Sequence, residues 1–117
     1  MDMSNELGTV AISDEVLCTI AGVAAKEVDG VADLSASLGS NIKDLITKKY
    51  VGKGVSVENA EGGLVVTLNL IIKFRANVQD VAVKVQDAVL SAINDMTNYE
   101  VEAVNVNVVN VQIEEEK

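Results

Sequence analysis

The 117-residue sequence contains no histidine, a single cysteine and only three aromatic residues. Without histidine, the chain cannot build serine–histidine or cysteine–histidine nucleophilic sites, imidazole acid–base catalysis or histidine-ligated zinc sites. With Cys18 alone, no disulfide can form within the chain, a pattern typical of cytoplasmic proteins. The scarcity of aromatic residues and the abundance of valine favour strands and closely packed helices over large aromatic pockets.

Membrane-spanning and secretory signals are also missing from the sequence. The longest nearly apolar run, residues 17–25, is far shorter than the roughly 20 residues that a membrane-spanning helix needs. The N-terminal sequence MDMSNELG has no basic segment followed by an apolar run, so it does not resemble a signal peptide. We therefore expect one cytoplasmic domain at residues 1–113 and a disordered acidic tail at residues 114–117.

Basic residues are scarce outside the middle of the chain. The net charge is −9, yet residues 43–75 carry six basic against three acidic side chains. The overall sign opposes binding to nucleic acid, which depends on the neutralisation of phosphates. A basic patch in this middle segment can instead meet an anionic surface or the acidic segments of a second copy, and its members are Lys43, Lys48, Lys49 and Lys53.

Hydrophobic patterns predict a strand and a helix in the first third of the chain. Residues 8–13 are predicted to form a short strand of the sheet, and Ser13 is a suitable N-cap for a helix over residues 14–29. That helix is apolar on almost every side, so we expect it to be largely buried, with Cys18 as a core residue. Gly30 is predicted to end the helix in a left-handed cap.

The middle of the chain combines an ambiguous segment with a clear hairpin. Residues 32–54 are difficult to interpret and are predicted to hold one short helix over residues 41–49. Strands at residues 55–58 and 64–75 follow, joined by a turn over residues 60–63. The second strand alternates strictly, and its predicted inward residues are Leu64, Val66, Leu68, Leu70, Ile72 and Phe74.

A second helix and a valine-rich strand complete the predicted fold. Asn77 is expected to cap a helix that runs to about Met96 and carries an apolar stripe at helical spacing. In the final strand, residues 101–113, the alternation slips at Val108-Val109, which predicts a β-bulge that keeps three later residues inward: Val109, Val111 and Ile113. The order β-α-(α)-β-β-α-β predicts an α+β fold, a two-layer split β-α-β-like sandwich with both helices on one face of an antiparallel or mixed sheet.

Motifs that carry chemistry are not found. The glycine-containing segments VGKG and GLGS do not match phosphate-binding loops, and no acidic run has the spacing of a calcium loop. Adjacent carboxylates such as Asp14 and Glu15 are interpreted as helix-end charges. The RNA-recognition motif shares the predicted plan, but here the outward positions of the central strands lack aromatic residues for base stacking. We therefore expect no catalytic residue, cofactor, metal, nucleic acid or small-molecule substrate.

Charged residues are also scarce on the predicted outer face of the sheet. The outward positions include Thr9, Ala11, Ser56 and Val65, and the candidate interaction surface comprises Thr67, Asn69, Ile71, Asn105, Asn107, Asn110 and Gln112. Charges are depleted at the centres of protein interfaces, so this composition indicates a contact surface. A second interpretation stays open at this point, in which residues 32–53 fold over the face.

Two segments carry a family resemblance. Residues 8–34, GTVAISDEVLCTIAGVAAKEVDGVADL, and residues 78–113, VQDVAVKVQDAVLSAINDMTNYEVEAVNVNVVNVQI, resemble the start and end of the alkaline-shock protein family of Gram-positive bacteria. This family is also called the Gls24 or envelope stress response family. Its members often have an aromatic–glycine pair after the long strand, where this chain has Phe74-Arg75. Because arginine adopts positive φ less readily than glycine, we expect this turn to differ.

The resemblance implies a small, cytoplasmic, non-enzymatic protein of envelope stress and homeostasis. Some members of the family lie at the inner face of the membrane through a separate membrane-anchored partner. Together with the uncharged face, this leads us to expect a self-associating scaffold or binding module, a homo-oligomer that docks to a membrane-linked protein. The alternative is peripheral binding to anionic lipid through the basic cluster of residues 43–53, where each lysine contributes about 1 kcal/mol.

Overall fold

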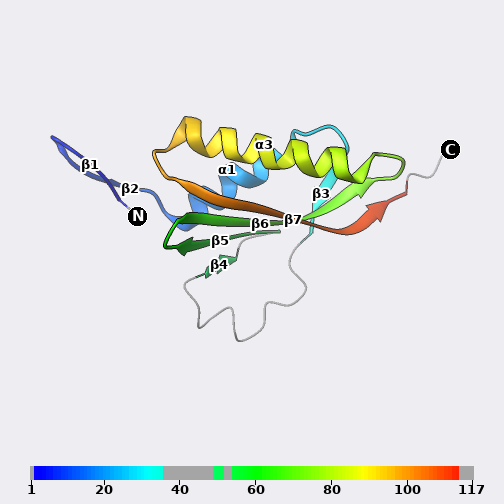
Figure 1. The fold of residues 1–117 in the computed structure, drawn as a ribbon, viewed down its shortest axis with the longest axis horizontal. Coiled ribbons are helices and arrows are strands. Elements are labelled where there is room, and N and C mark those ends of the chain that lie inside the picture. The colour runs from blue at the N-terminus through cyan, green and yellow to red at the C-terminus, as the bar shows by residue number, and fades with distance from the viewer. Residues whose placement is uncertain (1, 36–48, 52–53, 114–117) are drawn as a thin grey trace.

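The computed structural model describes residues 2–35, 49–51 and 54–113, and Figure 1 shows their arrangement. In the described residues, the elements are β1 (Asp2–Asn5), β2 (Gly8–Ala11), α1 (Asp14–Lys26), β3 (Val31–Leu34), β4 (Lys49–Val51), β5 (Val55–Ala60), β6 (Gly63–Lys73), α3 (Val78–Met96) and β7 (Val101–Gln112).

The main sheet is built around β6. On one side β7 pairs with β6 in parallel, along nearly its whole length. On the other side β5 and β3 pair with successive segments of β6, both antiparallel, and β4 extends the sheet beyond β5. Because β6 and β7 are parallel, the connection between them has to cross over the sheet, and α3 supplies this crossover. The sheet is therefore mixed, which the predicted fold class allowed.

Both helices lie on the same side of the main sheet, which confirms the predicted two-layer α+β plan (Figure 1). The inward residues of β6 are completely buried, as the alternation predicted, and they are Leu64, Val66, Leu68, Leu70 and Ile72. They meet a stripe on α3 at helical spacing, made of Val81, Val85, Val89 and Ile93. The two periodicities thus place one continuous core between the layers.

The first predicted strand does not join the main sheet. Strand β2 pairs antiparallel with β1, from Asn5 opposite Gly8 to Asp2 opposite Ala11. The resulting hairpin projects from one end of the molecule (Figure 1). The predicted placement of Thr9 and Ala11 on the outer face is therefore wrong. A local pattern of alternation indicates a strand but does not determine which partner the strand pairs with.

Strand β3 pairs with β6 in the main sheet, although no strand was predicted at residues 31–34. Its register shifts between Val31 and Asp33, so Ala32 is an extra residue in the ladder. Ser35 N–H then donates to the Asn69 carbonyl at 2.9 Å and continues the pairing. A strand of four residues with an irregularity inside it offers too little alternation to be recognised in the sequence.

Helix α1 begins as predicted and ends earlier. Ser13 caps it, with Oγ accepting a hydrogen bond from Val16 N–H at 3.2 Å. The helix ends at Lys26 with a right-handed cap, so Gly30 is not its left-handed cap. Gly30 has φ +102° in the turn into β3 instead, where a Cβ atom would lie 2.6 Å from a methyl carbon of Val81. One stripe of α1 faces solvent, since the side chains of Val16 and Val23 are exposed.

The predicted bulge in the last strand is present, but its predicted consequence holds only for Val111, which pairs with the inward residue Ile72 and is 40% exposed. Leu70 pairs with Val108 and Ile71 pairs with Asn110, so Val109 is the extra residue. Val109 is 47% exposed because the extra residue leaves the ladder rather than continuing the inward face. Two residues predicted to be inward lie beyond the ends of their strands and are also exposed, namely Phe74 and Ile113.

The turn after β6 holds Arg75 at φ +79°, the positive value that the aromatic–glycine pattern of the family suits. Replacement of Arg75 by glycine or by alanine removes the same contact, in which the guanidinium carbon lies 5.2 Å from the Phe74 ring centroid. We expect Arg75→Gly to be more stable than Arg75→Ala by about 1 kcal/mol, because only glycine adopts this φ without strain. Urea unfolding of both variants tests this, and an alanine variant as stable as the glycine variant would contradict the strained turn.

Candidate interaction surface

The register of β6 and β7 places the seven candidate residues on one face of the sheet. Thr67 pairs with Asn105 and Asn69 pairs with Asn107. Since the neighbours of these residues in β6 point inward, their own side chains point to the outer face. Beyond the bulge the same parity is kept. Three further candidates continue the face: Ile71, Asn110 and Gln112.

The amides on this face interact with one another across the strands. Asn107 Nδ2 donates to Asn69 Oδ1 at 3.1 Å, a cross-strand pair on the outer surface. Asn110 Oδ1 accepts from Val111 N–H at 2.8 Å, which fixes the side chain beside the bulge. The side chains on β6 are partly buried while the amides on β7 are exposed, so the face is most accessible towards the β7 edge.

Charged residues lie at the rim of this face. Ser56 pairs with Thr67 near the centre and is buried, whereas Glu58 pairs with Val65 one step towards the turn. At the other end Lys73 pairs with Gln112 in the last step of the ladder. The structure therefore brings together an uncharged centre with charges around it, the distribution that protein interfaces share.

The segment that was the alternative cover for the face is only partly described. Its first residues form β3 and lie within the sheet itself rather than over it. Of the rest, Ser35 continues the pairing with β6 and residues 49–51 form β4, whereas residues 36–48, 52 and 53 lie outside the described residues. A helix was predicted over residues 41–49. Its last residue, Lys49, is instead the first residue of β4, and the other residues of that helix lie outside the described part of the chain. Three members of the basic patch lie outside the described residues: Lys43, Lys48 and Lys53.

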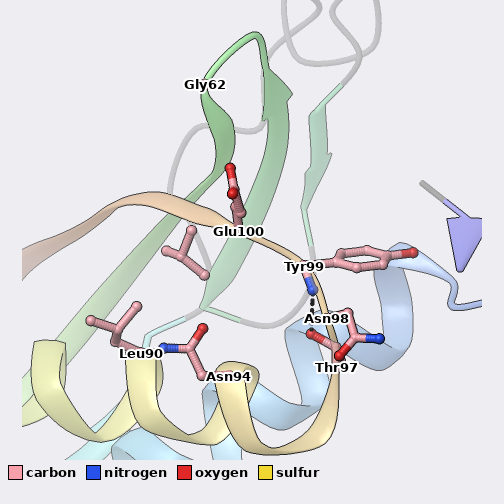
Figure 2. A pocket seen from close by; sticks show the side chains of 8 residues that line it. Gly62, Leu90, Asn94, Thr97, Asn98, Tyr99 and Glu100 are labelled. Atoms are coloured by element: carbon pink, nitrogen blue, oxygen red, sulfur yellow. Dashed lines mark hydrogen bonds between the residues drawn. The ribbon is translucent and has the colours of Figure 1, made fainter.

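A shallow pocket of about 530 Å³ lies where α3 ends and β7 begins (Figure 2). It is lined by Gly62, Leu90, Asn94, Thr97, Asn98, Tyr99, Glu100 and Val101. The Thr97 hydroxyl is engaged in the local backbone, since it donates to the Ile93 carbonyl at 2.8 Å and accepts from Tyr99 N–H at 3.1 Å. The lining contains a single carboxylate and two amides. No motif in the sequence indicated this pocket.

Cys18 occupies the core position that the sequence predicted. It is buried on α1, and its Sγ donates to the Val55 carbonyl at 3.7 Å. Among the residues that the structure describes, no three or more cysteine and carboxylate side chains are grouped closely enough to hold a metal ion. Within that same part of the chain, no helix is both long and apolar enough to cross a membrane.

Within the described residues, the fold and the face define a small α+β domain in which α1 and α3 lie over a mixed sheet whose outer face has an uncharged centre. The chain belongs to the alkaline-shock protein 23 family, which has a cell envelope-related function, and the family model matches residues 2–113. This confirms the resemblance found in the sequence.

Several relatives extend this result. Uncharacterized protein YqhY of Bacillus subtilis is 32% identical over 108 residues, which cover 92% of this chain and 80% of that protein. Uncharacterized protein Spy1535 of Streptococcus pyogenes is 32% identical over 103 residues, or 87% of this chain and 78% of that one. A stress response regulator gls24 homolog of Streptococcus pyogenes is 28% identical over 110 residues, covering 93% of this chain and 62% of that protein. No solved structure matches the chain.

Proposed function

We propose that this protein serves the envelope stress response without catalysis, as a self-associating scaffold or binding module that docks to a membrane-linked partner. The family supports the envelope-related role. The observation that carries the rest is the uncharged centre of the outer face, formed on β6 and β7 in a protein of net charge −9. A face that only met water in so acidic a protein would be expected to carry more charge.

The physical basis of the contact is the low cost of removing this face from water. Amide and hydroxyl groups can exchange hydrogen bonds with water for hydrogen bonds with a partner, whereas a buried unpaired charge costs far more. The Asn69–Asn107 pair shows that the amides here already bond across strands. Their side chains are short and partly held, so ordering them at an interface costs little conformational entropy.

The direct test places two charges in the middle of the face. We expect Asn105→Lys with Asn107→Lys to fold and to lose association, since each lysine would be buried without a partner in the contact. Light scattering at tens of micromolar protein, at low and high salt, measures the assembly, and thermal unfolding monitors the fold.

The matched control adds the same charge elsewhere. Thr19→Lys with Ser91→Lys places two lysines at exposed positions of α1 and α3, on the opposite side of the molecule from the outer face. This control is expected to associate like the wild type. If the double variant on the face assembles as well as the control does, the interface lies elsewhere. If the wild type is a monomer at both salt concentrations, self-association is wrong.

Direct binding to anionic lipid through the basic patch stays a prediction, because three of its four lysines lie outside the described residues. Flotation with vesicles of neutral and of anionic lipid tests it. Binding that does not increase with the anionic fraction would rule out this alternative.

A further inference from the structure

Strand β7 is an edge of the main sheet and pairs only with β6 among the described strands. The hydrogen bonds of β6 reveal which backbone groups of β7 face outward. Asn69 N–H donates to Gly54, and the Asn69 carbonyl accepts from Ser35, both at 2.9 Å, so the backbone groups of Asn69 face β3 and β5. Backbone groups alternate sides along a strand, hence those of Leu68 face β7.

The same alternation then assigns the groups of β7. Leu68 lies opposite Val106, so in a parallel ladder its groups bond to the residues on either side, Asn105 and Asn107. The backbone groups of Val104, Val106 and Val108 consequently point away from β6. A side-chain contact agrees with this assignment, because Gln86 Nε2 on α3 donates to the Val104 carbonyl at 2.9 Å.

This edge lacks most of the features that keep sheet edges apart. Between residues 101 and 112 there is no proline and no lysine, and the only charged residue is Glu102. Bulges do occur, at Glu102 and at Val109, where the register with β6 shifts. They lie at the two ends of an uninterrupted stretch, residues 103–108, whose edge is regular and long enough to receive another strand.

The sequence at the centre of this stretch is palindromic. Residues 104–108 read Val-Asn-Val-Asn-Val, which is the same in both directions. We propose that β7 pairs antiparallel with β7 of a second copy, about a two-fold axis at Val106. In this two-fold arrangement each valine lies opposite a valine of the other copy, and Asn105 lies opposite Asn107. Both copies therefore present the same surface to each other, as an isologous interface requires. A second copy of this chain therefore fits the edge better than an unrelated strand.

The flanking residues are compatible with this register. Glu102 would lie opposite Asn110 of the second copy, so no like charges meet. The Val104 carbonyl keeps a second lone pair, so Gln86 does not have to release it. In the helix layer above, Val83 lies one turn from Gln86 on the same flank of α3 and is 46% exposed, which leaves an apolar side chain to pack against the partner.

This inference rests on the proposed self-association and places the contact between copies at the β7 edge of the outer face, where the lysines of Asn105→Lys with Asn107→Lys would lie opposite each other as like charges. Edge pairing would join the outer faces of two copies into one uncharged surface, with Asn105 and Asn107 at the seam. A membrane-linked partner would then meet a face twice as wide as that of one copy.

Cysteine cross-linking tests the register. Asn105→Cys and Asn107→Cys are made separately, each with Cys18→Ser, and are expressed alone or together with different affinity tags. In the proposed register, Asn105 and Asn107 of the second copy form a non-hydrogen-bonded antiparallel pair, in which Cα atoms lie about 4.5 Å apart, within disulfide range. By contrast, Asn105 and Asn105 of the second copy lie on a diagonal of roughly 7–8 Å, and the same holds for the two copies of Asn107. We therefore expect the co-expressed pair to form at least about five times more disulfide-linked dimer than either variant alone.

Co-expression of Asn107→Cys with Ser91→Cys serves as the control, because Ser91 is exposed and lies on a different flank of α3 from Gln86 and Val83. If the pair of strand variants cross-links no more than this control or than each variant alone, pairing of β7 at Val106 is wrong. If this happens while light scattering still finds an oligomer, self-association stands and only the edge geometry fails. A monomer by light scattering would overturn both.

Discussion

Replacement of Leu68 by alanine is expected to lower the free energy of unfolding by about 3–5 kcal/mol. Leu68 lies at the centre of β6 between Val55 and Val106, and its side chain is 0% exposed. The helices cover it, so the truncated side chain leaves a cavity that the surrounding core can fill only in part. This loss is a large share of the 5–15 kcal/mol by which domains are typically stable.

Thr67→Ala is the matched control for this experiment, since Thr67 precedes Leu68 and faces the other side of the sheet. We expect it to cost under about 1 kcal/mol, because it leaves no cavity in the core. Urea unfolding followed by far-ultraviolet circular dichroism measures both, at one protein concentration because association would add to the apparent stability. Similar losses in the two variants would contradict the assignment of the inner and outer faces of β6.

The central elements could be predicted from sequence because their patterns are long. The alternation in β6 and the helical stripe of α3 each extend over many residues, so chance matches are excluded. The turn between β5 and β6 was also predicted, because two glycines interrupt two strand patterns. These elements carry the core, which explains why the α+β plan was predicted correctly.

Strand partners could not be predicted in the same way. The hairpin pairing of β2 with β1 and the insertion of β3 beside β6 depend on contacts between distant residues. Phe74 and Ile113 continue the alternation in the sequence, but the strands end before them, so both are exposed. The pattern determines which way a side chain points within a strand, and the ends of the strands are set by the surrounding structure.

For the candidate surface, too, the direction of side chains could be predicted from the sequence, whereas the position of a strand in the sheet could not. The parity of β6 and β7 placed Asn69 and Asn107 on one face, and the structure agrees. The bulge was located correctly, yet Val109 was assigned to the wrong side because an extra residue belongs to neither face of the ladder. The open edge of β7 was not predicted at all, since a sequence does not reveal which strand is last in a sheet.

Gly63→Ala is expected to destabilise the protein by about 2–4 kcal/mol, from backbone strain and from a steric clash together. Gly63 begins β6 with φ +132°, and an added Cβ atom would lie 2.7 Å from the Glu100 carbonyl oxygen. That oxygen accepts the hydrogen bond from Leu64 N–H at 2.8 Å, the first contact between β6 and the start of β7. The clash is with backbone, so relief requires the two strands to separate there.

The neighbouring glycine provides the control, because the sequence alone does not distinguish Gly62 from Gly63. A Cβ atom at Gly62 would meet the carboxylate of Glu102, 3.0 Å away at its carbon, and this exposed side chain can move aside. We therefore expect Gly62→Ala to change stability by less than about 1 kcal/mol. Urea unfolding compares the two, and hydrogen exchange should report faster opening at Leu64 in Gly63→Ala alone. Equal losses at both positions would mean that β6 and β7 do not approach each other closely at Glu100.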